Sequence, residues 1–494
     1  MATTTAFDPY LLTPLDHIVL KVYMSYCLSF RLEDPASGLP ALQAGVNRLI
    51  SALPFLAGYV AESTKLDGKK NVMEVQPPTV PLETIPMLQV KYYPHHTIPP
   101  NGIHGSTTQS ETTEVISLNE SCSPLPFFIP PSQPKPVLRF QASIMADGIV
   151  LTMAFHHSVL DATGSAIVLE MLAQCCRTSP ADIIQLPTDH EHESHSRRLI
   201  FDATAFLHEQ KDHTDVYGPL ESTSDHSLGP GIDIKASSAS DLCIHPFVFS
   251  SERIRRIKDA CNSRTFEHLH AHKHGPISSN NILTALLAIC IDRARRSKLP
   301  NRTDRSQLFV AVNLRGRLQP PLPENYLGNA VTVARILLTP PSLHLKQFLE
   351  NQSPSICDGI DDGDLHQIAS LATNISAKVT SINDEFVRSF ISYVRGHQDW
   401  SFTNTKLPDV IVSSTRHLKV YSLDFGTILG QIDGFELLQP RTLDGVCIIM
   451  PDRRRTVHTD AQTPPWDVRL TLNTTTVQYL MDDPLFCWAL ETGH

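Results

Sequence analysis

Apolar residues in the segment 40–58 follow the three-to-four spacing of an amphipathic helix: Leu42, Val46, Leu49, Ile50 and Leu53. Pro54 follows them directly, and proline lacks the backbone N–H that a helix interior needs. We therefore predict a helix in this segment that Pro54 stops. Prolines and polar clusters interrupt residues 60–130, which predicts short strands and loops there.

A β-hairpin is predicted next. Residues 137–145 alternate between apolar and polar, residues 149–155 are largely apolar, and Asp147–Gly148 between them supplies turn chemistry. From Gly164 to about Arg177 the apolar positions return to helical spacing, which predicts a helix.

The second half of the chain predicts a further set of helices and strands. Residues 187–240 are polar and are the predicted linker. Residues 277–296 begin with polar capping residues and continue as a long apolar helix. The predicted strands are 308–317, which runs into a basic turn, a segment starting at Val331, and 410–414, 446–450 and 468–472. The pattern indicates a mixed α/β protein with two halves.

Composition excludes several classes of protein. Hydrophobic residues make up 41% of the 494 residues and charged residues 19%, which is enough for a sizeable core. No apolar run reaches the length of a membrane span, and the start of the chain lacks the features of a secretory signal. The formal charge of −10 argues against general nucleic-acid binding. Ten cysteines without a C-x-x-C motif indicate reduced thiols in a cytoplasmic protein.

The sequence AFHHSVLDATG, residues 154–164, concentrates chemistry at the end of a predicted buried strand. A histidine there is well placed as a general base, because its unperturbed pKa of about 6.5 lets it accept and return a proton near neutral pH. His157 and Asp161 could instead be metal ligands, or a buried histidine satisfied by a loop carboxylate. This motif alone does not decide among the three interpretations.

Five segments, taken together and in order, resemble the BAHD acyltransferases, CoA-dependent enzymes that acylate alcohols and amines. The segments are LPFLAGYV (53–60), HHSVLDATG (156–164), ILTALLAICIDRAR (282–295), VNLRGRLQPPLPENYLGN (312–329) and VSSTRHLKVYSLDFG (412–426). They look like the family's leucine–proline–leucine–alanine–glycine segment, its H-x-x-x-D-G signature, its helix ending in alanine–arginine, its N-x-R-x-R…Y-x-G-N segment and its D-F-G-W-G stretch.

The chain departs from the family pattern at three places. Ala162 stands where the signature has glycine, and Thr415 and Thr427 stand where tryptophans are common. These departures are similar to those of fungal members of the trichothecene O-acetyltransferase type, which modify terpenoids, alkaloids and polyketides.

The resemblance implies two chloramphenicol-acetyltransferase-like α/β domains with mixed sheets, joined by a crossover, with an active-site channel at their interface. The implied boundaries are 1–200 for the N-terminal domain, 201–240 for the crossover and 241–494 for the C-terminal domain. His157 would be the general base of a direct transfer, with no metal and no covalent acyl-enzyme. No G-x-S-x-G elbow supports a covalent alternative.

Several other residues receive roles by the same resemblance. Asp161 would support the His157 loop by pairing with an arginine. Asp424 would be either a second functional residue beside the histidine or a residue that holds the fold through an ion pair, for which we take Arg315 as the hypothetical partner. The oxyanion of the transfer needs a hydrogen-bond donor, and Ser414, Thr415 and Thr427 are the options.

The phosphates of CoA require a basic rim on this acidic protein. The options are two arginine clusters: Arg293, Arg295 and Arg296, and Arg453, Arg454 and Arg455. His156 is interpreted as a packed neighbour of His157. Two histidine-rich tracts, at His190, His192 and His195 and at His268, His270, His272 and His274, are interpreted as exposed loops, and no metal is predicted.

The predicted function is acyl-CoA-dependent O-acylation, with acetyl-CoA as co-substrate and a hydroxyl of a fungal secondary metabolite as acceptor, by a monomer without nucleic-acid or membrane partners. One alternative is N-acylation by the same chemistry. Another is a condensation-domain-like enzyme that takes its acyl group from a carrier protein, since those domains share the doubled histidine of His156–His157. A third is an inactive scaffold that serves as a binding module.

Overall fold

The computed structural model describes most of the chain. The described residues are 7–78, 84–98, 114–115, 118–130, 132–177, 186–203, 212–219, 242–263, 276–298, 304–338, 359–438, 443–453 and 463–491.

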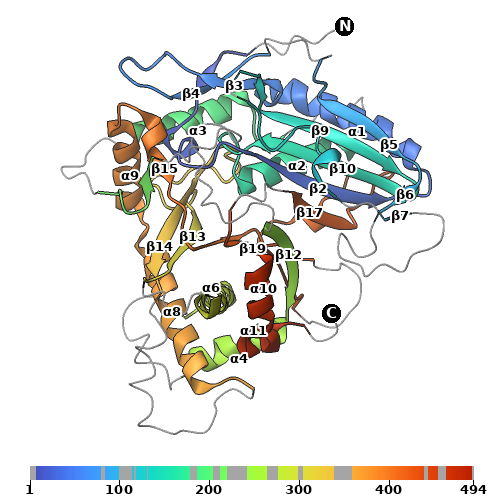
Figure 1. Cartoon of the computed structure of the whole chain (residues 1–494). Helices are drawn as coiled ribbons and strands as arrows, with labels where there is room; N and C mark the ends of the chain where they lie inside the picture. Colours follow the sequence, from blue (N-terminus) through green and yellow to red (C-terminus); the bar gives the residue numbers. More distant parts are fainter. Residues whose placement is uncertain are drawn as a thin grey trace.

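The N-terminal part is built on a five-stranded mixed sheet with the strand order β17-β2-β10-β9-β5. Its strands are β2 (Tyr23–Arg31), β5 (Leu88–Tyr93), β9 (Leu138–Met145), β10 (Gly148–His156) and β17 (Gly434–Leu438). The predicted hairpin is confirmed, because β9 and β10 pair antiparallel from Met145↔Gly148 to Leu138↔Phe155. This sheet lies in the upper part of Figure 1.

Helices α1 (Pro35–Ala52) and α2 (Ala162–Arg177) pack on one face of this sheet (Figure 1). Alternate residues of the central strands, among them Leu28, Phe30 and Leu151, bury their side chains on this face. The first helix starts at Pro35 and not at the predicted Pro40, because the Asp34 side chain caps it by accepting from the Ala36 N–H. It ends as predicted before Pro54, which opens a 3-10 turn over Pro54–Ala57.

The strand β17 comes from the far end of the chain but completes the N-terminal sheet. It pairs antiparallel with β2, from Gly434↔Ser29 to Leu438↔Ser25. From the sequence, residues 241–494 were predicted to form one C-terminal domain. The strand β17 lies within this range but belongs to the sheet of the N-terminal part.

The C-terminal part is a six-stranded mixed sheet with the order β12-β19-β18-β16-β13-β14. Its strands are β12 (Leu242–Phe249), β13 (Gln307–Asn313), β14 (Val331–Leu337), β16 (Val410–Ser414), β18 (Val446–Ile449) and β19 (Trp466–Asn473). The predicted strands of the second half are confirmed, although β13 ends before the basic turn. Neighbours β13, β16 and β18 run parallel to one another.

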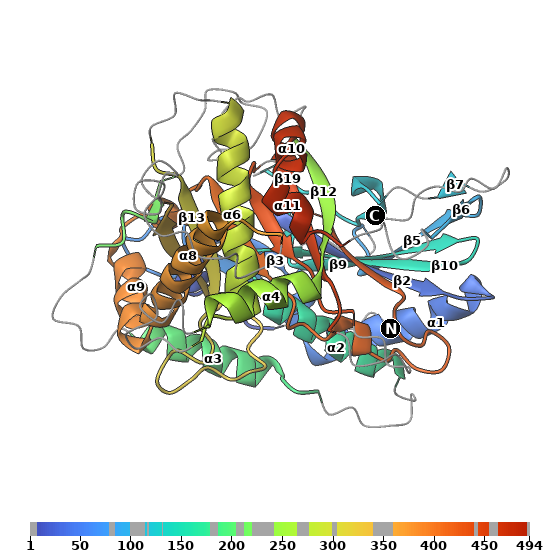
Figure 2. The ribbon, with the colours of Figure 1, turned by 90° about the horizontal axis from the view of Figure 1, so that it is seen from below.

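A long buried helix, α6 (Ser279–Lys298), forms the core beside this sheet (Figure 2). It is the predicted apolar helix, and every residue from Ile282 to Asp292 is buried. The other helices in the described residues of this half are α4 (Ser251–Cys261), α8 (Asp362–Ser381), α9 (Asp384–Gly396), α10 (Thr474–Met481) and α11 (Pro484–Ala489).

The remaining described strands form three smaller sheets. One is four-stranded, with β1 (Tyr10–Leu11), β4 (Met73–Gln76), β3 (Tyr59–Glu62) and β8 (Lys135–Pro136) in that order; the others pair β6 (His96–Thr97) with β7 (Glu114–Val115) and β11 (Tyr217–Gly218) with β15 (Asn404–Thr405).

Part of the predicted polar linker is a helix, α3 (His190–Asp202). The prediction of a loop at His190, His192 and His195 is therefore wrong, although His192 and His195 are exposed as predicted. Asp189 caps the helix by accepting from the His192 N–H, and its inward face carries the charged residues Glu193 and Arg197. Because this buried face is largely charged, apolar periodicity could not reveal it. The tract from His268 to His274 lies outside the described residues.

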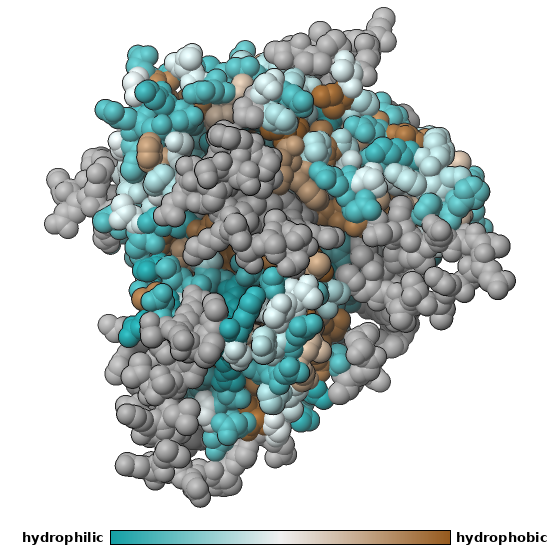
Figure 3. All heavy atoms as spheres, viewed as in Figure 1, coloured by the Kyte–Doolittle hydropathy of each residue, from teal (hydrophilic) through white to brown (hydrophobic). Residues whose placement is uncertain are grey.

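Within the described residues, no helix has the length and apolarity that crossing a membrane requires. The same residues contain no cluster of three or more histidine, cysteine or acidic side chains arranged to hold a metal ion. On the face shown in Figure 3, hydrophobic and hydrophilic described residues are interspersed.

Candidate active site

The loop that carries His157 joins the end of β10 to the start of α2. The His157 N–H donates to the backbone oxygen of Val22 at 2.9 Å, which ties the loop to the chain just before β2. Asp161 stands at the N-cap of α2, where its Oδ1 accepts from the Gly164 N–H at 2.8 Å. The strand end and the helix cap thus fix both ends of this short loop.

The half-buried His157 ring faces a backbone carbonyl group through its Nδ1 atom, which lies 3.3 Å from the Leu160 oxygen. The carbonyl of His157 itself also acts on the pKa of the ring. Carbonyl oxygens only accept, so we assign the proton of the neutral ring to Nδ1. This tautomer leaves the Nε2 lone pair free to accept a proton.

Burial of the ring lowers the pKa of His157 below its usual value. The two carbonyl contacts and the Asp161 charge act in the opposite direction without reversing the shift. At neutral pH the ring is therefore neutral, as a general base requires.

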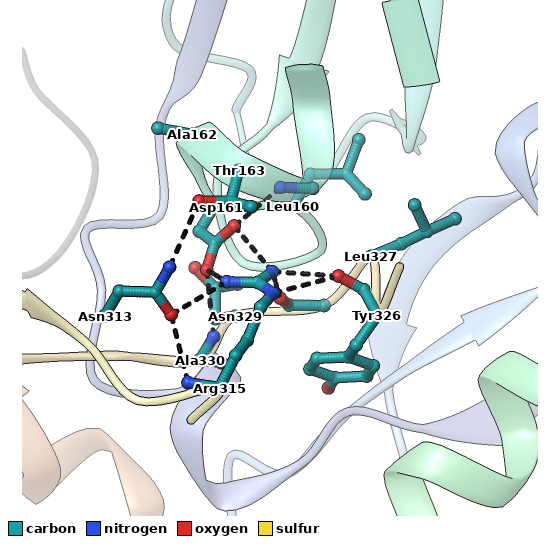
Figure 4. A network of polar contacts seen from close by, with 12 residues as sticks. Leu160, Asp161, Ala162, Thr163, Asn313, Arg315, Tyr326, Leu327, Asn329 and Ala330 are labelled. Carbon is teal, nitrogen blue, oxygen red and sulfur yellow. Dashed lines mark hydrogen bonds and ion pairs between the residues drawn. The ribbon is translucent and has the colours of Figure 1, made fainter. Parts of the chain in front are cut away.

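Asp161 pairs with Arg315. The two guanidinium nitrogens Nη1 and Nη2 donate to Oδ2 and Oδ1 at 2.8 and 2.9 Å, and both side chains are 7% exposed. Arg315 also donates to the backbone oxygens of Tyr326 and Gly328, and the Ala330 N–H donates to Asp161 Oδ2 (Figure 4). We call Asp161, Arg315 and these loop contacts the clamp.

The clamp joins the His157 loop to the loops that flank β13 and β14. Gly164 belongs to the same contact: a Cβ atom there would lie 1.9 Å from the Leu327 oxygen. Only a glycine lets the first turn of α2 approach this loop so closely.

A cavity of about 500 Å³ lies along α2 on the side of residues 417–424. It is lined by Thr163, Ala166, Ile167, Glu170, Ala173, Gln174, Arg177, Glu324, His417, Leu418, Lys419, Val420, Ser422, Leu423 and Asp424. The lining reaches the clamp region, since the Thr163 hydroxyl accepts from Asn313, which in turn accepts from the Arg315 N–H. Burial lowers the pKa of His417 on the same wall. His157 itself is not among the lining residues described.

Comparisons with known proteins identify the family of this chain. Residues 124–478 match the model of the transferase family, and residues 22–176 match the trichothecene 3-O-acetyltransferase-like N-terminal domain. The chain belongs to the transferase family. It is an acyltransferase, and the BAHD resemblance that the motifs indicated is confirmed.

Named relatives of this transferase cover its whole length. The fumigaclavine B O-acetyltransferase of Aspergillus fumigatus is 38% identical, over 99% of both chains. The communesin N16 acyltransferase of Penicillium expansum is 37% identical, over 99% of this chain and all of the relative.

A solved structure confirms the fold class, with two domains built on mixed sheets. TRI101 of F. sporotrichioides, determined with coenzyme A and T-2, superimposes with a TM-score of 0.67 at 16% identity, covering 98% of this chain and 99% of that one.

Asp424 of the transferase lies at the rim of the cavity and not in the clamp. Its Oδ2 is 3.7 Å from Arg177 Nη1, with side chains 47% and 53% exposed, and its Oδ1 accepts from the Gly426 N–H. The hypothetical Asp424–Arg315 pair is wrong, because Arg315 is engaged by Asp161. Sequence spacing could not distinguish which of the two aspartates faces the arginine.

The three hydroxyl residues predicted for the oxyanion are placed differently. The buried Thr415 hydroxyl already donates to the Ile449 oxygen at 2.7 Å, which removes it as a donor to substrate. Thr427 is exposed on the turn that follows Asp424, and Ser414 is half-buried at the end of β16. Ser414 as hydrogen-bond donor to the oxyanion therefore stays a prediction. Thr427 lies on the outside of the turn.

Most arginines of the predicted basic rim form ion pairs with aspartates of the protein itself. Arg293 pairs with Asp364 at 2.5 Å, Arg295 with Asp444 at 2.8 Å, and Arg296 with Asp292 at 2.8 Å. These pairs offset the charges that CoA phosphates would need, so this cluster is a poor choice for the donor site.

The second arginine cluster is described only in part. Arg453 lies 3.3 Å from Asp467, and Arg454 and Arg455 lie outside the described residues.

His156 is a packed neighbour, as interpreted. It is 3% exposed, its ring meets Tyr23 edge-on at 5.2 Å, and burial lowers its pKa to about 3.

Sequence reasoning gave no role to two residues of the site region. Asn329 donates to the His157 backbone oxygen, and His417 lines the cavity. The Y-L-G-N and S-S-T-R-H segments pointed to these regions but not to these side chains.

Proposed function

We propose that this acyltransferase is an acyl-CoA-dependent O-acetyltransferase that esterifies a hydroxyl group of a fungal secondary metabolite, with His157 as general base. The observation that carries the proposal is the ring of His157, whose Nδ1 faces the Leu160 carbonyl oxygen and whose Nε2 is left as a base.

The transfer takes place in one ternary complex. Nε2 of His157 accepts the proton of the acceptor hydroxyl while its oxygen attacks the thioester carbonyl carbon. The tetrahedral intermediate collapses, the carbon–sulfur bond breaks, and the protonated ring returns its proton to the CoA thiolate. Holding both substrates beside one base supplies proximity in place of covalent catalysis.

The cavity along α2 is our proposed site for the acyl-CoA. It starts at Thr163, six residues after the base in sequence, and ends at Arg177. Arg177 and Lys419 on its wall offer positive charge for phosphate groups, and its volume lies within the range of ligand sites, about 300–1,000 Å³.

Relatives support the acceptor class. The fumigaclavine B O-acetyltransferase suggests an alkaloid-type hydroxyl as the acceptor. A second function, acylation of nitrogen, is favoured by the similarly close communesin N16 acyltransferase. The same base serves both, because an amine also loses a proton when it attacks a thioester.

We further propose that the enzyme works in the cytoplasm as a monomer. All nine cysteines of the described residues are free thiols, which fits a reducing compartment.

The first test is calorimetric titration with acetyl-CoA, free CoA and longer acyl-CoAs, which requires no acceptor. We expect micromolar binding with a preference for one acyl length. Absence of binding to folded protein would contradict the proposal and favour a carrier-protein donor or an inactive scaffold.

The second test is His157→Ala, assayed by CoA-thiol release with fumigaclavine B as the probe acceptor. Loss of a general base lowers kcat by about 10²–10⁴-fold, while acetyl-CoA binding is retained. His192→Ala is the control, because His192 is an exposed residue of α3. Wild-type turnover in a folded His157→Ala enzyme would refute the general-base role.

A further inference from the structure

Asn329 links the His157 loop to a buried charged cluster. Its side-chain nitrogen Nδ2 donates to the His157 backbone oxygen at 2.9 Å and to Asp16 Oδ1 at 2.9 Å. Its backbone N–H donates to the same Asp16 oxygen at 2.9 Å. Asn329 is fully buried, so water cannot replace these contacts.

The orientation of this amide follows from its partners. A backbone carbonyl and a carboxylate can only accept, so the NH₂ end of Asn329 must face both. Each of its two N–H bonds then has one acceptor, and no other neutral side chain of similar size offers two such donors.

Asp16 is itself held in place. Its Oδ2 accepts from the Thr13 N–H at 2.7 Å and from Arg197 Nη1 at 2.9 Å. Arg197 comes from α3, where it also pairs with Glu193 at 2.9 Å and lies 4.8 Å over the Tyr10 ring. All of these charged side chains are at most 4% exposed.

Asn329 therefore holds the backbone of His157 at its own carbonyl group, while Nδ1 of the ring lies 3.3 Å from the Leu160 oxygen. A displaced His157 backbone would move the ring relative to Leu160 and change the direction of Nε2. The chain of contacts therefore runs from α3 through Asp16 and Asn329 to the base.

We propose that Asn329 is a positioning residue for His157: it fixes the His157 backbone carbonyl and thereby the orientation of the ring, and Asp16 with Arg197 and Glu193 of α3 supports it. The inference rests on the proposed role of His157 as the base. It assigns a function in the reaction to a helix from the polar segment between the two halves of the chain.

The test is Asn329→Asp, which keeps the size of the side chain but removes both N–H donors. The readout is the rate at which diethyl pyrocarbonate modifies His157, followed by peptide mass spectrometry across pH, since this reagent attacks the unprotonated ring and needs no acceptor. We expect the pH at which the modification rate is half-maximal, the midpoint, to move upward, because a carboxylate close to His157 favours imidazolium. We also expect turnover with fumigaclavine B to fall about 100-fold, with the acetyl-CoA KM within about twofold of wild type.

Asn404→Asp is the matched control, because Asn404 is also a buried amide that donates to a backbone oxygen, that of Ser401, away from His157. It should leave the His157 midpoint unchanged. Asn329→Ser, which keeps one donor and adds no charge, should lower turnover by a smaller factor without raising the midpoint, and it serves if Asn329→Asp does not fold.

A folded Asn329 variant with a wild-type midpoint and wild-type kcat would overturn the inference, even if its melting temperature were lower. Full activity in His157→Ala would instead refute the proposed function. The two failures are distinguishable, because the modification rate reports on the ring whether or not the ring is the base.

Discussion

Asp161 and Asp424 both stand in motifs of the family, but the structure gives them opposite surroundings. Asp161 is buried in the clamp, where it accepts two hydrogen bonds from Arg315 and two from backbone N–H groups. Asp424 is half-exposed at the cavity rim and meets Arg177 at 3.7 Å. A motif position therefore does not tell how much an acidic residue stabilises the fold; burial and the number of donors do.

The largest expected effect is that of Asp161→Asn. It leaves the Arg315 guanidinium buried with no carboxylate partner in the clamp, and loss of one member of a buried pair costs about 3–5 kcal/mol. Urea unfolding should show this as a lower midpoint at constant slope. A loss below about 1 kcal/mol would mean that the clamp is no stronger than the rim pair.

Gly164→Ala tests the clamp from the side of the helix. The new Cβ would lie 1.9 Å from the Leu327 oxygen, so α2 and the loop must move apart. We expect a loss of about 2 kcal/mol, by urea unfolding, in line with other overpacked sites. Gly316→Ala is the control, because a Cβ there meets nothing within 4 Å. Equal stability of the two variants would contradict the close approach.

The comparison also predicts a difference in pH dependence. The Asp161 charge raises the pKa of His157 against the larger, lowering effect of burial. Removing that charge in Asp161→Asn should lower the pKa further, so the acid limb of kcat/KM moves to lower pH. Asp424→Asn should leave the limb in place. A shift of the limb to higher pH in Asp161→Asn would contradict the assigned electrostatics.

Local elements were predictable from sequence, and contacts between distant segments were not. Asp147–Gly148 between two strand patterns was enough to predict the β9–β10 hairpin, and the uninterrupted apolar run was enough for α6. The pairing of β17 with β2 joins residues some 400 positions apart, and alternation carries no information on the partner strand.

The site shows the same division. The position of His157 at the end of a strand could be predicted from its motif, because the strand before it and the capped helix after it are both local features of the sequence. The partner of Arg315 was predicted wrongly, since 154 positions separate it from Asp161 and both motif aspartates carry the same charge. The helix α3 was missed because Glu193 and Arg197 bury charge where a pattern of apolar residues was expected.

The smallest expected effect is that of Asp424→Asn. Had Arg315 been the partner of Asp424, this variant would lose a buried pair, but the partner is Arg177 and both side chains are about half-exposed. Solvent screens such a pair, and the Gly426 N–H can still donate to the amide oxygen of asparagine. We expect the free energy of unfolding to change by less than about 1 kcal/mol in urea. A normal stability with a weaker calorimetric affinity for acetyl-CoA would support the proposal that the cavity lined by Asp424 binds the acyl-CoA. A loss of unfolding free energy as large as that of Asp161→Asn would refute the contrast between the two aspartates.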